Sequence, residues 1–559
     1  MMGITEVNPL PAHYRCLKCK HSIFKDEDGK DLGATYSSGF DLPDKKCPKC
    51  GSLMYKDGQD MPFATFLGFN ADKVPDIDLN FSDLNQASAH EYTKVLFGVD
   101  NVYRAGTIGT VADKTAFGYV KGYCEDKNVM MRTAEVERLA AGCTGVKRTT
   151  GQHPGGIIVV PKGREIYEFC PVQHPTDDPN SDIITTHFDY HSIDQNLLKL
   201  DILGHDDPTI IKMLEDLTGV NALNIPLDDE QVLSLFNNTS ALGVTPDDLM
   251  GLDLGSLGVP EFGTEFVMQM LRDTKPKNFS DLVRISGLSH GTDVWLNNAQ
   301  YYIARGDCTL STAICTRDDI MTYLIHTGVE DGMAFNIMEK VRKGLVAKGK
   351  VPQWEEWKET MKQAGVPDWY IESCGKIKYM FPKAHAVAYV MMAFRIAYFK
   401  VYYPLAYYAA FFSIRAKAFD YELMCQGRER LETTMKDYKK RLSAKQLSPK
   451  EEAAYGDMKI VQEMYARGYE FMPIDIFQAK AKHFQIIDGK LMPALNTIDG
   501  MGDKAAEGVV EAAKDGPFTS CENFKTRSKV SGTIVDKMRE MGMLGDLPLS
   551  DQMSLLDFM

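Results

Sequence analysis

Short apolar stretches separated by polar, Gly-rich or Pro-rich segments occupy the first 210 residues. Alternating or continuous apolar runs of this length are typical of β-strands. They predict strands at 74–81, 157–160 and 196–204. Between them, runs with helical spacing predict helices over Val111–Tyr123 and about Met130–Ala141. The first part of the chain is therefore expected to be mixed α/β.

From about 208 to 465 the apolar positions recur mostly with the helical period of 3.6 residues. Loops are expected at 251–264 and 286–294, and a long apolar helix from about Phe381 to Tyr403. Charged, periodic residues at 428–456 predict a solvated pair of helices, and a β-like piece follows at 483–492. The whole chain is thus predicted to be a multidomain α/β protein that is mostly helical.

The predicted strand at 74–81 carries Asp76 and Asp78 one residue apart. In a strand the side-chain period of two places both carboxylates on one face, with Ile77 and Leu79 on the other. Neighbouring carboxylates repel unless a cation lies between them, and Mg²⁺ prefers carboxylate oxygens. This predicts a metal site for phosphoryl transfer. The alternative is an Asp-rich turn after Pro75, since Asp-x-Asp alone is weak.

The predicted strand at 196–204 has a single carboxylate, Asp201, between apolar residues. A buried carboxylate costs free energy unless it is paired or binds a metal. Lys199 lies two positions away, on the same face. Asp201 is therefore the expected third ligand beside Asp76 and Asp78.

Two Cys-x-x-Cys pairs near the start of the chain flank a polar, Gly-rich segment: Cys16 and Cys19, then Cys47 and Cys50. This spacing is typical of a zinc ribbon, in which the metal supplies folding energy to a unit with little core. Four thiolates predict a closed structural site rather than a catalytic one with a water. The alternative is four unrelated thiols.

Several further stretches combine glycine or aromatic residues with cations. Lys147–Gly156, which includes His153, is a basic, Gly-rich loop ahead of a strand; it could approach phosphates, but an ordinary hairpin entry is favoured. Lys383, His385 and Tyr389 gather at the start of the long apolar helix, and Leu288–Trp295, which includes His290, is a polar insertion. Most aromatic residues near that helix are interpreted as core.

Gly500 and Gly502, followed by Lys504, predict the hairpin of a helix-hairpin-helix unit. Amides at the second helix N-terminus of such a unit can bind a DNA phosphate without sequence preference. A plain helical turn is an equally good interpretation of the motif alone. A degenerate second copy is expected at Met541–Gly545.

The composition limits these hypotheses only mildly. A length of 559 residues predicts roughly three to five domains. The net charge of −14 counts against nucleic acid, yet basic clusters occur at Lys436–Lys445 and Lys525–Lys529. We find no apolar run of about 18 residues and no signal peptide, so no membrane partner and a cytoplasmic location with reduced thiols are expected.

Four motifs, taken in order, resemble the C-family bacterial replicative DNA polymerases: Asp76–Phe81, Arg104–Thr107, Gly151–Gly156 and Lys199–Gly204. The Cys₄ insertion and Leu288–Trp295 make the chain similar to the PolC-type DNA polymerase III alpha subunit family. The resemblance covers essentially the whole chain. It implies a DNA-directed DNA polymerase of chromosome replication, in which two Mg²⁺ ions at Asp76, Asp78 and Asp201 assist transfer of a nucleotide from a dNTP to a primer 3′-hydroxyl.

The same resemblance implies a polymerase-beta-like palm with helical thumb and fingers. Along the chain we expect a partial palm with the zinc ribbon inserted at about 14–54 (1–83), a thumb (84–165), the second part of the palm (166–207), fingers (208–465), a helix-hairpin-helix duplex-binding domain (466–547) and a clamp-binding tail (548–559). Residues expected near primer or nucleotide are Lys199, His153, Lys383, His385 and His290.

The last residues form an exposed apolar tail that is expected to dock in a partner's pocket; the alternative is a frayed terminus. The tail is similar to the family's sliding-clamp peptide, which implies clamp-binding roles for Gln552, Ser554, Leu555, Leu556 and Phe558. Expected partners are primer-template DNA, dNTP, the sliding clamp (beta), and clamp-loader or other replisome subunits.

The chain departs from the family pattern in having no PHP or proofreading exonuclease region, and it resembles the C-terminal part of a longer polymerase. Two other classes of function are therefore kept open. Clustered carboxylates also occur in metal-dependent nucleases. The chain by itself could also be a non-catalytic module that binds DNA and the clamp.

Overall fold

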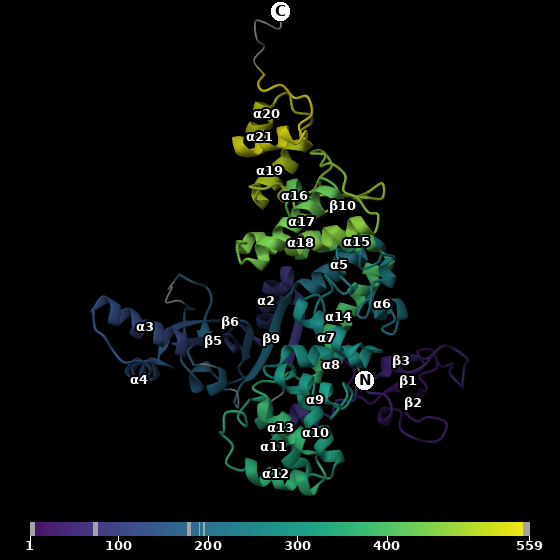
Figure 1. Ribbon diagram of the computed structural model, residues 1–559, viewed down its shortest axis with the longest axis vertical. Coiled ribbons are helices and arrows are strands. Elements are labelled where there is room, and N and C mark those ends of the chain that lie inside the picture. Colours follow the sequence, from purple (N-terminus) through teal and green to yellow (C-terminus); the bar gives the residue numbers. More distant parts are fainter. Residues whose placement is uncertain (1–5, 71–76, 176–179, 189, 194–195, 552–559) are drawn as a thin grey trace, which may run out of the picture. The chain divides into compact units, whose positions relative to one another are not determined.

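The computed structural model describes residues 6–70, 77–175, 180–188, 190–193 and 196–551. It divides into two compact units, Phe63–Pro208 and the remainder of the chain on either side, Met1–Pro62 with Thr209–Met559. Figure 1 labels the elements of both. The two units are described one at a time.

A six-stranded mixed sheet forms the centre of unit Phe63–Pro208, with the order β4-β9-β6-β5-β8-β7. β4 and β9 run parallel, and β6 is antiparallel to both of its neighbours, β9 and β5. The strands predicted over 77–81 and at 196–204 are confirmed. The strand bounds are β4 Ile77–Ser82, β5 Val102–Thr110, β6 Lys147–Val159, β7 Val172–Gln173, β8 Thr185–Thr186 and β9 Leu198–His205.

One face of this sheet is apolar and packs against helix α2 (Gln86–Phe97). Alternate residues of β4 and β9, including Leu79 and Ile202, join one core with Ala89 of α2. Because side chains alternate along a strand, the residues between them point to the opposite face. The carboxylates of Asp78 and Asp201 therefore lie on the face away from this core.

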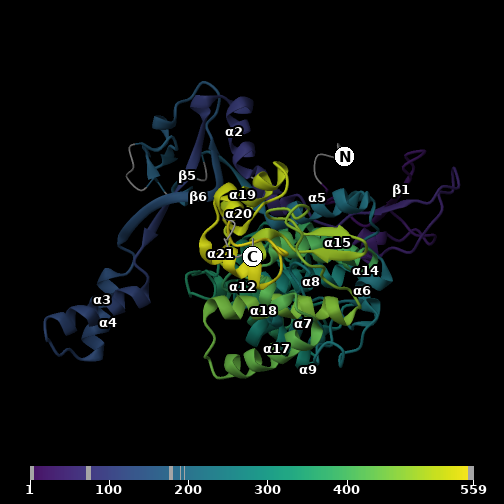
Figure 2. The ribbon, with the colours of Figure 1, turned by 90° about the horizontal axis from the view of Figure 1, so that it is seen from above.

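β5 and β6 extend beyond the sheet as an antiparallel ribbon that ends in a helical hairpin, α3 (Asp113–Asp126) and α4 (Thr133–Cys143). Figure 2 shows the two helices at the end of the ribbon remote from α2. Val120 and Val136 pack between them. Both helices confirm the sequence-based predictions to within a few residues.

The prediction of a loop at Lys147–Gly156 is wrong, because this stretch forms most of strand β6. Close packing accounts for glycine in this stretch. A Cβ on Gly155 would lie 2.9 Å from the carbonyl oxygen of Ile202. The backbone hydrogen bonds of β5 satisfy the stretch, so it pairs instead of turning outward.

The Cys₄ segment folds as a small three-stranded sheet in the other unit, with the order β2-β1-β3. The strands are β1 His13–Arg15, β2 Ser22–Ile23 and β3 Tyr55–Asp57. A small apolar cluster that includes Tyr14, Leu42 and Met54 is its core. So small a core is marginal alone, which agrees with a metal-stabilised unit.

Helices make up most of the rest of this unit, and α14 spans 20 residues, twelve of which are buried. The prediction of a loop over 286–294 is wrong at its start, because α8 continues to His290. The helices are α5 Asp206–Thr218 (which begins in the other unit), α6 Glu230–Ser234, α7 Glu265–Thr274, α8 Phe279–His290, α9 Gln300–Arg305, α10 Arg317–His326, α11 Asp331–Arg342, α12 Trp354–Gln363, α13 Asp368–Lys376, α14 Lys383–Tyr402, α15 Pro404–Ala410, α16 Tyr421–Met424, α17 Arg428–Ser443 and α18 Pro449–Ala466.

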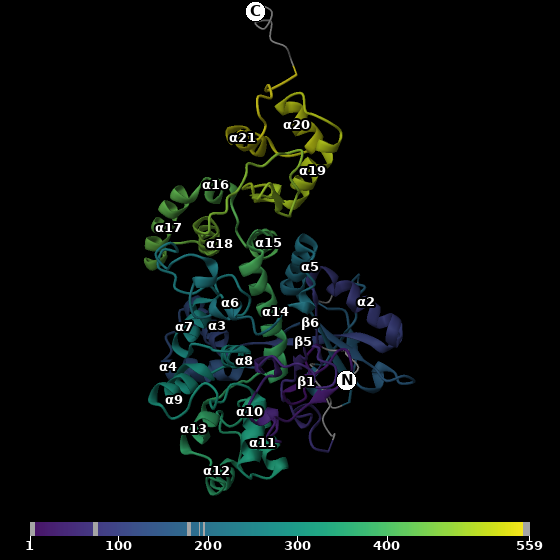
Figure 3. The same ribbon diagram turned by 90° about the vertical axis from the view of Figure 1, so that its right-hand side faces the viewer.

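The last part of the chain forms its own apolar core, separate from that of α14, α15 and α18. A β-hairpin, β10 (Gln485–Ile487) and β11 (Lys490–Met492), precedes three short helices. Figure 3 shows these helices grouped together. Their bounds are α19 Asp503–Lys514, α20 Cys521–Ser528 and α21 Gly532–Glu540. Among the described residues, no helix has the length and apolar character needed to cross a membrane.

Candidate active site and metal centres

Asp78 of β4 and Asp201 of β9 are direct register partners in the parallel strand pair. Register partners on neighbouring strands point to the same face, so the fold brings together two of the three carboxylates singled out in the sequence. Asp78 is exposed, whereas the residue Asp201 is only 9% exposed. Asp76, the third carboxylate, lies outside the described residues.

Asp201 has a cation on one side and an imidazole on the other. Its Oδ2 lies 2.8 Å from Nζ of Lys199, as the shared strand face predicted. The ammonium of Lys199 also lies over the ring of Tyr190, 5.1 Å from its centroid. Nδ1 of His153 is 3.7 Å from Oδ1 of Asp201, too far for a hydrogen bond.

The side chain of His153 is held by two backbone amides of its own strand, β6. Its Nδ1 accepts hydrogen bonds from the amides of Gly155 (3.2 Å) and Gly156 (2.7 Å). An amide can only donate, so Nδ1 carries no proton, and in the neutral ring the proton is on Nε2. β6 bulges here, because Gln152 pairs with Gly106 while Ile157 pairs with Arg104. The bulge turns the imidazole toward the carboxylate face.

The carboxylate face has the donor set that a hard cation needs. Oδ1 of Asp201 is buried and, among the described residues, has no hydrogen-bond partner. Such an oxygen is costly unless something positive completes it. Mg²⁺ binds carboxylate oxygens. Asp78 is the register partner of Asp201 and supplies a second carboxylate on the same face. The residues present therefore fit a magnesium site.

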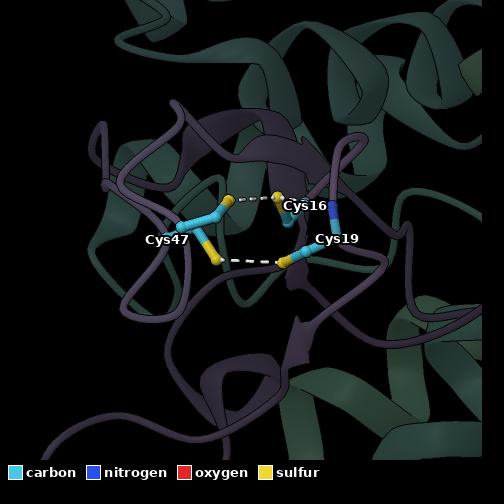
Figure 4. A group of neighbouring side chains, drawn as sticks. Cys16, Cys19 and Cys47 are labelled. Carbon is cyan, nitrogen blue, oxygen red and sulfur yellow. Dashed lines mark hydrogen bonds between the residues drawn. The ribbon is translucent and has the colours of Figure 1, made fainter.

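The four predicted zinc ligands form one cluster. Their sulfurs all lie within 4.8 Å of one another; Cys16 and Cys50 are 3.4 Å apart, and Cys19 and Cys47 are 3.5 Å apart. Figure 4 shows the sulfurs of the two Cys-x-x-Cys pairs facing each other. Tetrahedral zinc with bonds of about 2.3 Å requires sulfurs about 3.8 Å apart. The cluster therefore fits a structural zinc ion.

Local hydrogen bonds lower the pKa of two of the four thiols. A hydrogen bond from the Ser52 side chain, followed by one from its backbone, lowers the pKa of Cys50 to about 6. The backbone of Cys19 likewise lowers the pKa of Cys16. Both effects favour the deprotonated form that a metal requires. At Cys19 a backbone hydrogen bond from His21 acts to lower the pKa, but burial and the neighbouring thiols raise it to about 12.

His290 and His385 come together from different helices, α8 and α14. Their ring centroids are 5.5 Å apart, and Phe381 lies 5.5 Å from His290 and 4.8 Å from His385. Tyr389 completes the group, 4.4 Å from His385. The polar segment Leu288–Trp295 and the start of α14 thus form one aromatic cluster.

Lys383, predicted beside these histidines, points elsewhere. Its backbone amide donates to Oδ2 of Asp318 (2.7 Å), and its ammonium lies 3.4 Å from the carbonyl oxygen of Ser37 and 3.5 Å from that of Asp60. Burial lowers the pKa of Lys383. Asp318 has no distinguishing pattern in the sequence, because an acidic residue at the start of a helix is common.

The predicted hairpin at Gly500–Gly502 leads directly into α19. Gly500 has φ = +88°, where a non-glycine residue would be strained. Gly502 is the N-cap of α19, and both it and Lys504 are exposed. The element before the hairpin is only a 3₁₀ turn, Leu495–Thr497. The tail residues Gln552, Ser554, Leu555, Leu556 and Phe558 lie outside the described residues.

The chain is similar to bacterial DNA polymerases over nearly its whole length. It is 57% identical over 554 residues to DNA polymerase III PolC-type from Bacillus subtilis (strain 168), 56% identical over 555 residues to that of Clostridium perfringens, and 55% identical over 557 residues to that of Staphylococcus aureus. Each alignment covers at least 99% of this chain. The chain belongs to the PolC-type DNA polymerase III family. It spans about 37–38% of the length of these relatives.

Family models match the elements that carry the candidate sites. Residues 1–127 and 118–204 match the bacterial DNA polymerase III alpha NTPase domain, which includes Asp78 and Asp201. Residues 207–365 match the finger domain, which contains His290. A helix-hairpin-helix motif matches 468–552 and contains the Gly500–Gly502 hairpin. The PolC-type family thus accounts for the mixed sheet, the helical body and the C-terminal helices.

Proposed function

We propose that this chain supplies the polymerisation centre of a bacterial replicative DNA polymerase, joining a dNTP to a primer 3′-hydroxyl. The observation that carries the proposal is the pair Asp78 and Asp201, which are register partners on one sheet face, with a buried oxygen of Asp201 left for a cation. Membership of the PolC-type family supports the assignment. Asp76 is proposed as the third ligand.

The metal would supply two effects: it lowers the pKa of the primer hydroxyl and stabilises charge on the phosphate under attack. Asp78 and Asp201 would hold it on the sheet face, and Lys199 would orient Asp201 through the contact at 2.8 Å. His153, whose Nδ1 accepts hydrogen bonds from two amides, is proposed to lie near primer or nucleotide.

His290, His385 and Lys383 are proposed to act on the nucleotide side. The aromatic cluster of His290, His385, Phe381 and Tyr389 offers planar faces for a base or sugar. The proposed role of Lys383 is the least direct of the three, because its ammonium lies against the carbonyl oxygens of Ser37 and Asp60. Its proposed effect is to hold the start of α14 in place.

The domain assignment follows from the same proposal. Residues 1–83 and 166–207 would be a palm of the polymerase-beta type, 84–165 the thumb, 208–465 the fingers, 466–547 the duplex-binding domain and 548–559 the clamp-binding tail. Gly500, Gly502 and Lys504 would contact the DNA backbone without reading sequence. Zinc would hold the ribbon, and the sliding clamp and other replisome subunits would be cytoplasmic partners.

Because the chain spans under two fifths of its relatives, a second function is proposed for the chain alone: a DNA-binding and clamp-binding module without catalysis. The chain should be incubated with primer-template, Mg²⁺ and one dNTP, beside a polypeptide of the relatives' full length. Lengthening of the primer supports a polymerase, and shortening supports a nuclease. Binding without extension by the 559-residue chain, with extension by the longer one, supports the module.

The test of the site compares Asp201→Asn with Asp83→Asn, an exposed acid just after β4. In the longer polypeptide Asp201→Asn should reduce extension on the order of a thousandfold or more, because a metal clamp contributes several kcal/mol. Primer-template binding should persist in both variants. Extension retained by Asp201→Asn would refute the assignment.

A further inference from the structure

His290 forms an ion pair with a residue that the sequence pattern did not single out. Its Nε2 lies 2.8 Å from Oε2 of Glu261, and the two side chains are 25% and 16% exposed. Glu261 belongs to the irregular segment before α7, whereas His290 is the last residue of α8. The pair therefore joins a loop to a helix end.

Both ring nitrogens of His290 are engaged. Nδ1 lies 2.7 Å from the carbonyl oxygen of Ser286, which can only accept, so Nδ1 carries a proton. Nε2 faces a carboxylate, and the C-terminal end of α8 favours a cation. Burial acts to lower the pKa of His290, but Glu261 and the Ser286 carbonyl outweigh it and leave that pKa raised. Because both nitrogens face oxygen atoms that accept, the geometry assigns a proton to each, and both N–H groups of the resulting imidazolium are committed.

The other groups that face His290 come from α14, from Phe381 just before it (5.5 Å between ring centroids) and from its own helix. His385 and Tyr389 lie 5.5 Å and 6.4 Å from it, centroid to centroid, and the hydroxyl of Ser289 is 3.3 Å from Nδ1. Glu261 is the one carboxylate among the groups named here. With both nitrogens held, the ring cannot rotate, and its orientation relative to His385 is set by Glu261 and Ser286.

The backbone at Glu261 is strained. Its φ is +67°, in the left-handed region that favours glycine. The backbone stays there while the amide of Phe262 donates to the carbonyl of Pro260 at 2.8 Å. Glycine would adopt this conformation without strain and could not reach His290. Strain kept at a side chain that contacts a candidate site points to a role for that side chain.

We propose that Glu261 is a positioning residue of the nucleotide site: it holds His290 protonated and fixed against His385, so that a cationic edge and the adjoining aromatic faces are preformed for the incoming dNTP. This inference rests on the proposed polymerase function. Glu261 itself does not touch the nucleotide. Its effect passes through His290.

The charge state is tested without activity in the 559-residue chain. Histidine labelled with ¹⁵N, with His290 assigned by His290→Gln, should show both nitrogens of His290 protonated at pH 7.5. In Glu261→Gln the titration midpoint of His290 should fall by about one pH unit or more, since a charge-assisted hydrogen bond is lost. An unchanged midpoint in Glu261→Gln would overturn the proposal.

The role is tested in the full-length polypeptide by steady-state extension. Glu261→Gln should raise the KM for dNTP roughly tenfold at pH 8 with little change in kcat, and the defect should shrink at pH 6, where His290 is protonated without its partner. Glu265→Gln, an exposed residue that pairs with Arg272, is the control. A defect that is the same at both pH values would overturn the proposal.

Glu261→Asp is the control for a loss of folding in Glu261→Gln, because it keeps a carboxylate on a side chain that is one methylene shorter. It should keep His290 charged and give a KM between those of the parent and Glu261→Gln. A KM as high as that of Glu261→Gln, with His290 still charged, would contradict the proposal. Absence of extension by the parent protein would instead refute the polymerase function, and the ¹⁵N measurement would still decide the Glu261–His290 contact.

Discussion

The ammonium of Lys400 lies 2.9 Å from a carboxylate oxygen of Glu463, and both side chains are completely buried. Lys400 also donates to the carbonyl of Leu257 (2.6 Å) and to that of Gly255 (2.8 Å), and the hydroxyl of Tyr408 donates to Glu463 at 2.7 Å. These contacts pair the buried ammonium and the buried carboxylate with other groups of the protein interior. This network ties α14 to α18 and to the segment before α7, which also carries Glu261.

Lys400→Met should cost about 3–5 kcal/mol of folding free energy, because it leaves Glu463 as a buried charge without its cation. Urea unfolding followed by tryptophan fluorescence measures it, since all four tryptophans lie in Thr209–Met559. Lys440→Met, at an exposed position of α17, is the control. Adding Glu463→Leu to Lys400→Met should restore much of the loss; a loss under about 1 kcal/mol in the single variant would contradict this account.

Asp457 should make the same unit less stable as the pH rises. Burial raises its pKa to about 6, while its Oδ2 accepts from the amide of Ala418 at 2.7 Å. A carboxyl with a raised folded pKa stabilises the fold fully below about pH 4, and that contribution is lost as the pH rises through about 6. Asp457→Asn removes the dependence and should be about 2–3 kcal/mol more stable than the parent at pH 8.

The same urea titration at pH 5 and pH 8 measures this gap. Asp515→Asn, at an exposed position after α19, should show no such gap. If the difference between Asp457→Asn and the parent does not grow with pH, burial does not raise the pKa of Asp457 as described.

Loss of zinc should destabilise the start of α8. Asp41, in the ribbon, accepts from the amides of Phe279 (2.8 Å) and Ser280 (3.1 Å), which open that helix. Cys47→Ser should abolish zinc in atomic absorption and speed hydrogen exchange at these two amides, because the ribbon has little core of its own. Cys143→Ser, an exposed thiol on α4, should change neither. Full zinc content in Cys47→Ser would contradict the assignment.

Lys504 should contribute to duplex binding as a phosphate contact. Lys504→Ala should weaken binding of a fluorescent duplex equally for different sequences and reduce the slope of log affinity against log salt by about 1. Lys514→Ala, at the other end of α19 where Lys514 pairs with Glu511, is the control. An unchanged salt slope in Lys504→Ala would remove this residue from the DNA surface.

Sequence periodicity predicted the local elements well because local forces decide them. The strand of Asp201, the hairpin of α3 and α4 and the long helix α14 follow from spacing alone. Glycine misled the prediction at Lys147–Gly156, since glycine suits a loop and equally suits a strand whose neighbour comes too close for a Cβ. The end of α8 was also misjudged, because polar residues near a helix terminus resemble a loop.

The sequence by itself determined the family, the four thiols of the zinc ribbon and the shared strand face of Lys199 and Asp201, because motifs and short periods need no distant contact. Only the tertiary structure decided that Asp78 and Asp201 are register partners, that the ammonium of Lys383 faces the zinc ribbon and that Glu261 holds His290. These relationships join residues that lie 29 positions apart (Glu261 and His290) to 346 positions apart (Ser37 and Lys383) in the sequence. Strand register, burial and side-chain pairing across such distances arise only when the whole chain packs.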